Sequence, residues 1–110
     1  MTEAASWFCA SRGHVTATAA LPAPPVLWLA DTINMSAFDP DFYIDITGHI
    51  EVKKAMLNCH KSQLMRGKDG DFTPLMELML RQVAVRGSQA NVVSAEAFRA
   101  HHALKRAVAF

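Results

Sequence analysis

The segment DFYIDIT, residues 41–47, decides the fold class of this chain. Apolar and polar side chains alternate strictly along it, which is the pattern of a β-strand with one buried face. Phe42, Ile44 and Ile46 share that face. Thr47 then offers a hydroxyl that can cap a following helix. The segment therefore predicts a strand that passes directly into a helix.

Two longer helices are predicted after this strand. From Thr47 to about Arg66, apolar residues recur at helical spacing, and the stripe that they form is the expected buried face. A second helix is predicted from the helix-starting pair Thr73-Pro74 to Arg86, with Gly87 as its stop. The first stripe consists of Val52, Ala55, Met56, Cys59 and Gln63, and the second of Met76, Met79, Leu80 and Val83.

Shorter elements are predicted on both sides. Val26–Ala30 is a continuous apolar run, typical of a strand covered on both faces. Thr2–Arg12 is expected to form a short helix that Gly13 ends. After the second long helix, Val92–Val93 is a candidate short strand, and Ser94 is expected to cap a last helix through Phe98 toward Val108.

These elements predict an α/β fold of two short strands and about four helices. An isolated pair of strands is only marginally stable. The chain also has few residues that could cover a strand with two apolar faces. The mismatch indicates an incomplete fold, the part of a larger sheet.

Composition narrows the class of protein. The chain has 110 residues, 51% of them hydrophobic, with 11 Lys and Arg against 10 Asp and Glu. This is the size of one small domain, and a net charge of +1 argues against a nucleic-acid partner. No apolar run approaches the roughly 20 residues of a membrane span. The acidic start Met1-Thr2-Glu3 lacks the features of a secretory signal, so a cytoplasmic location is expected.

The histidines do not form a recognisable metal site. His49 and His60 would lie on nearly the same face of one helix, but their backbones would be separated by roughly 16 Å. His101 and His102 are adjacent and would point about 100° apart on a helix. No metal-binding, phosphate-binding or nucleophile motif occurs in the sequence, so no catalytic residue and no metal ligand is assigned. The basic residues Arg81, Arg86, Arg99, Lys105 and Arg106 are interpreted as solvated helix faces.

Several ordered blocks of this sequence resemble the C-terminal half of the LmbE-like (PIG-L) N-deacetylase family. The tightest match is a strand ending in Asp-Ile-Thr, a helix with a lysine and an alanine, and a closing Ser-Gln. A later Ala-Glu-Ala-Phe element is also similar to the family, as are the helix and strand before the first block. The blocks are residues 41–47, 53–56, 60–63 and 94–99, preceded by 7–13 and 26–31.

The resemblance implies a Rossmann-like, zinc-dependent hydrolase that removes acetyl groups from N-acetylglucosamine-type sugars or related amides. In that family, a His-Pro-Asp-Asp motif and a later histidine hold the metal, and the first Asp of the motif is the general base. None of these residues occurs in this sequence. The resemblance therefore implies that residues 1–110 form a single C-terminal lobe without the catalytic N-terminal half, inactive alone, with no cofactor of its own although zinc is implied for the complete enzyme.

Five residues are candidates for positioning the lobe or lining a cleft. Asp45 is expected either to bond the helix entrance at Thr47 or to point into a cleft, and the first is favoured because a carboxylate is stabilised near a helix N-terminus. Ser62 and Gln63 are expected to bond nearby loop backbone. The other two candidates are His60 and Glu96.

The expected partners are the missing N-terminal half, or a second copy of the chain bound through an exposed strand edge. An N-acetylated sugar is the implied substrate of the complete enzyme. The alternative function is a free-standing small interaction domain derived from this lobe.

Overall fold

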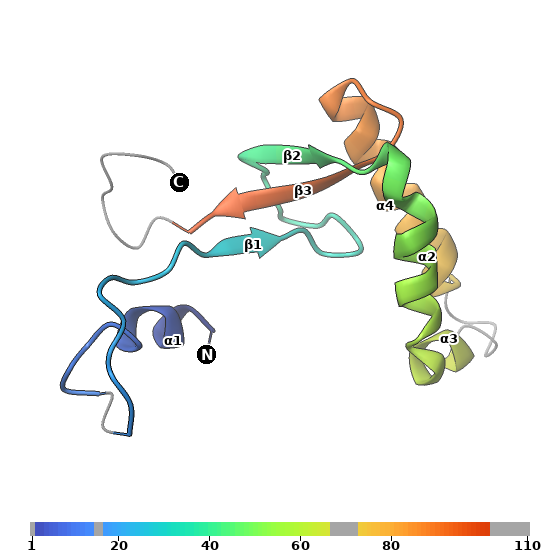
Figure 1. The fold of residues 1–110 in the computed structure, drawn as a ribbon. Coiled ribbons are helices and arrows are strands. Elements are labelled where there is room, and N and C mark those ends of the chain that lie inside the picture. Colours follow the sequence, from blue (N-terminus) through green and yellow to red (C-terminus); the bar gives the residue numbers. More distant parts are fainter. Residues whose placement is uncertain (1, 15–16, 67–72, 102–110) are drawn as a thin grey trace. The chain divides into compact units, whose positions relative to one another are not determined.

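A computed structural model describes residues 2–14, 17–66 and 73–101 (Figure 1). The described residues combine helices with a three-stranded sheet, so the α/β character is confirmed. They form two compact units, one holding residues up to Leu29 and from Ala100 on, the other holding Ala30–Arg99. The elements are α1 (Thr2–Phe8), β1 (Trp28–Ala30), β2 (Phe42–Asp45), the 3-10 turn η1 (Thr47–His49), α2 (Ile50–Asn58), α3 (Lys61–Arg66), α4 (Leu75–Ala90) and β3 (Ala95–Ala100).

The sheet has the strand order β1-β3-β2, so the last strand of the described chain is its centre (Figure 1). β2 and β3 are antiparallel, with Phe42 opposite Phe98 and Asp45 opposite Ala95. The rings of Phe42 and Phe98 stack with their centroids 5.6 Å apart. Such cross-strand aromatic pairs stabilise a sheet and help to set its register. The predicted strand at residues 42–46 is thus confirmed, ending one residue earlier, but its predicted buried face is wrong for Ile44, which is 38% exposed.

The prediction of a helix starting at Ser94 is wrong, because these residues form β3. Ala95 and Ala97 are almost completely buried, which only small side chains allow where neighbouring backbones pack closely. The carbonyl of Ala97 accepts a hydrogen bond from Asp31 N at 3.1 Å, and that of Ser94 accepts one from Ile46 N at 3.0 Å. These bonds to distant segments replace the local bonds of a helix. The predicted continuation toward Val108 lies outside the described residues.

The prediction for Val26–Ala30 is also corrected. β1 covers only Trp28–Ala30 and lies at an edge of the sheet, not in its interior. The side chain of Trp28 is 45% exposed. The apolar run is therefore not covered on both faces. Self-association through a strand edge stays a prediction.

The helix predicted from Thr47 to about Arg66 is divided into η1, α2 and α3. At the end of α2, Cys59 N donates to Met56 O at 3.1 Å and His60 N to Leu57 O at 3.0 Å. These three-residue steps are the tighter 3-10 pattern, which often ends a helix. α3 starts again after His60, whose carbonyl accepts a bond from Gln63 N.

The predicted buried stripe of the first helix is wrong. Val52 is 58% exposed and Met56 64% exposed. Ala55 and Cys59 are exposed as well, and so is Gln63 on α3. Ile50 and Leu57 are the residues of α2 that pack against the core instead.

The stripe predicted for α4 is confirmed for three of its four residues. Met79 and Val83 are buried with Ile46, whereas Leu80 is 36% exposed. This core joins the end of β2 to α4. The partly buried residues packed around it are Ile33, Ile50, Leu57 and Met76.

α4 passes through Gly87 and ends at Ala90, so Gly87 is not its stop. Asn91 ends the helix in the left-handed conformation with φ 58°, which asparagine tolerates better than most residues. Gly87 is instead required by a close approach, because a Cβ there would lie 2.6 Å from the carbonyl oxygen of Val93. Val92–Val93 is part of this return turn rather than a strand, and Val93 is 75% exposed.

We expect Gly87→Ala to lower the free energy of unfolding by about 1–3 kcal/mol, because backbone atoms of Val93 and Ser94 must move away from the new methyl group. The higher helix propensity of alanine offsets at most about 1 kcal/mol of this loss. Urea unfolding followed by circular dichroism measures the change. Gly48→Ala is the matched control, since a Cβ there meets no atom within 4 Å. Equal stability of the two variants would contradict the close approach.

The other unit contains α1. α1 ends at Phe8 rather than at Arg12, and the ring of Phe8 stacks on that of His14 at 4.3 Å. In the same unit, His101 N donates to Leu27 O at 2.9 Å. No helix within residues 2–14, 17–66 or 73–101 has the length and apolar composition needed to cross a membrane.

Candidate functional site

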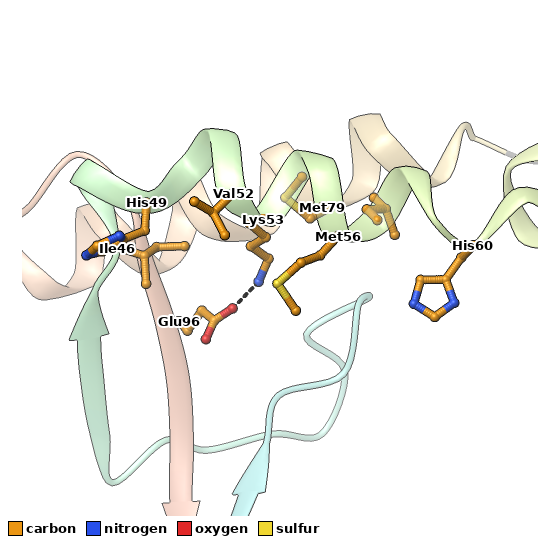
Figure 2. A pocket seen from close by; sticks show the side chains of 9 residues that line it. Ile46, His49, Val52, Lys53, Met56, His60, Met79 and Glu96 are labelled. Carbon is orange, nitrogen blue, oxygen red and sulfur yellow. Dashed lines mark hydrogen bonds and ion pairs between the residues drawn. The ribbon is translucent and has the colours of Figure 1, made fainter.

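A cavity of about 410 Å³ lies where α2 faces β3 and the end of β2 (Figure 2). Five of its nine lining residues are apolar, and the polar ones are two histidines, a lysine and a glutamate. This size and mixture are typical of small-molecule sites, in which few polar groups orient a ligand on an apolar wall. The apolar lining residues are Ile46, Val52, Met56, Leu57 and Met79.

Lys53 and Glu96 form an ion pair in this lining (Figure 2). Lys53 projects from α2 and Glu96 from β3, so the pair joins segments 43 residues apart. Their side chains are 26% and 35% exposed. A carboxylate accepts several hydrogen bonds and an ammonium donates three, so both groups can bind a polar ligand without separating. The pair is therefore the chemically strongest feature of the cavity.

The two histidines of the cavity lie at its opposite ends. Figure 2 shows His49 beside Ile46 and His60 beyond Met56. Of the predicted site residues, the cavity thus brings together His60 and Glu96. Sequence reasoning missed His49 as a site residue, and it placed Lys53 only within a block of the family resemblance.

Within the described part of the chain, no three His, Cys, Asp or Glu side chains lie close enough to hold a metal ion together.

Asp45 lies outside this cavity lining and binds the start of the following turn. Its Oδ1 accepts a hydrogen bond from Thr47 N at 2.8 Å. Hydrogen bonding by the side chain and then the backbone of Thr47 holds the pKa of Asp45 below its ordinary value, and His49 adds a smaller attraction. Of the two roles considered for Asp45, this hydrogen bond matches the first, in which the carboxylate binds the helix entrance at Thr47.

We expect Asp45→Ala to lower the melting temperature at pH 7, and to lower it progressively less as the pH falls below the ordinary pKa of the carboxyl group. Because the lowered pKa stabilises the folded state, this contribution is complete above the ordinary pKa of about 3.9 and is lost as the pH falls through the folded value. Thermal unfolding of both proteins across this range measures the effect. Direct carbon NMR titration of Asp45 supplies the control, and a midpoint at or above the ordinary value would contradict the prediction.

Ser62 and Gln63 are exposed on α3. They lie outside the lining of the 410 Å³ cavity. Their predicted contacts to loop backbone stay a prediction, and the structure gives them no position in the site.

A second polar cluster was missed from the sequence. Arg86, interpreted as solvated, is buried, and its Nε donates to Asp31 Oδ2 at 2.7 Å, with both side chains at most 6% exposed. Nearby, Gln82 Nε2 donates to Thr32 O at 2.6 Å. The spacing carried a signal, because Arg86 follows Met79 by seven residues and therefore lies on the buried stripe of α4.

Comparisons with known proteins add no assignment to this site. No family model matches the chain, and no solved structure matches it.

Proposed function

We propose that this chain forms the C-terminal lobe of a LmbE-like N-deacetylase with a Rossmann-like fold, and that the cavity beside Lys53 and Glu96 binds the N-acetylated sugar. The proposal assigns to the chain the binding and orientation of the substrate. The residues that hold zinc would come from another part of the enzyme. A cytoplasmic location belongs to the same proposal.

One observation carries the proposal. Four of the blocks that resemble the family, residues 41–47, 53–56, 60–63 and 94–99, each contribute at least one residue to the lining of one cavity. Residues 42–45 pair with 95–98 in register, and Lys53 of the second block contacts Glu96 of the last.

The chemistry of the pair suits an amino-sugar derivative. Glu96 can accept hydrogen bonds from sugar hydroxyls or from the amide N–H, and Lys53 can donate to hydroxyl or carbonyl oxygens. Charge-assisted bonds of this kind are about twice as strong as neutral ones. The chain would thereby hold the acetamido group in place while another segment supplies the metal-activated water.

Complementation tests this proposal. The full chain is mixed with the zinc-bearing N-terminal segment of a LmbE-like deacetylase, and acetate release from N-acetylglucosamine is measured. We expect release from the mixture but from neither component alone. Glu96→Gln and Lys53→Met should each lower the rate by about 10-fold to 100-fold, the equivalent of one charge-assisted hydrogen bond.

The matched control is Arg81→Ala, which breaks an exposed ion pair with Glu77 on α4 and should leave the rate unchanged. Circular dichroism checks that every variant is folded. A mixture that is as inactive as its folded components would contradict the proposal.

The alternative is a free-standing interaction domain. The observation in its favour is the exposure of Val52 and Met56 on α2, at 58% and 64%. Exposed neighbouring apolar side chains often mark a contact surface. A folded chain that fails the complementation test would favour this reading.

A further inference from the structure

We draw no further inference here: the strongest candidate, the exposed apolar surface patch of Val52 and Met56 on α2, carries no proposal, because nothing in the described part of the chain shows what covers it.

Discussion

Replacing Arg86 by alanine should lower the free energy of unfolding by about 3–5 kcal/mol. The guanidinium contacts Asp31 at 2.7 Å, and the two side chains are 6% and 4% exposed. Without Arg86, the carboxylate of Asp31 stays buried with no opposite charge, which is among the largest single penalties in a folded protein. Urea unfolding, followed by circular dichroism at 222 nm, measures the loss.

The control for this prediction is Arg81→Ala, because the pair between Arg81 and Glu77 has both side chains 58% exposed. Such surface pairs contribute about 0–1 kcal/mol. The double variant Asp31→Leu with Arg86→Met should recover most of the loss, since it removes both buried charges together. If Arg86→Ala and Arg81→Ala unfold at the same urea concentration, Arg86 is not buried in solution.

Some polar atoms of the Asp31–Arg86 pair lack a hydrogen bond, and this is why the double variant should recover stability. Asp31 Oδ1 and Arg86 Nη2 are buried and have no hydrogen-bond partner among the described residues. Buried ion pairs stabilise a protein only when further hydrogen bonds compensate the loss of water. Arg86 Nη1 has one such bond, to Gln89 Oε1 at 2.8 Å. Breaking the pair is therefore costly, but replacing it with apolar side chains is not.

Met79→Ala should lower the free energy of unfolding by about 2–5 kcal/mol, whereas Met56→Ala should change it by less than about 0.5 kcal/mol. Met79 is 3% exposed in the core with Ile46 and Val83, so its truncation leaves a cavity. Met56 is 64% exposed and loses little burial. Urea unfolding of both variants under the same conditions measures the difference.

The two methionines are each other's control, because the substitution removes the same atoms. A large loss at Met56 would mean that the stripe predicted from the sequence is the buried face of α2 after all. Equal losses at both positions would contradict the placement of the core between α4 and the end of β2.

The spacing of apolar residues predicted those elements that depend mainly on contacts of their own segment. The alternation at residues 42–46 predicted β2 but not the side chains that it buries, because Ile46 is buried whereas Ile44 is 38% exposed. The buried side of α4 was identified by Met76, Met79 and Val83, because apolar residues that repeat every 3.6 positions share one face of a helix. Glu96 and His60 were named as site candidates, although spacing alone did not show that they lie in one cavity.

The face of α2 could not be predicted in the same way. Its apolar residues lie on more than one side of the helix, so their spacing alone does not show which of them are buried. Two hydrogen bonds hold Thr47 in the turn η1 before α2, one from Thr47 N to Asp45 Oδ1 and one from Ser94 N to Thr47 Oγ1 at 3.2 Å. The second of these bonds joins residues 47 positions apart, so the sequence around Thr47 does not contain it.

By itself, the sequence determined the mixed α/β class, the strand at residues 42–45 and most of the buried stripe of α4. Each of these follows from the spacing of apolar residues within one short segment. Only the tertiary structure decided that residues 95–100 form the central strand. Alanine and glutamate favour helices, but here hydrogen bonds from Asp31 and Ile46 and the close packing of Ala95 and Ala97 outweigh that preference. The same long-range pairing brings Glu96 to Lys53 and buries Arg86 against Asp31, since contacts between distant segments exist only once the chain has folded.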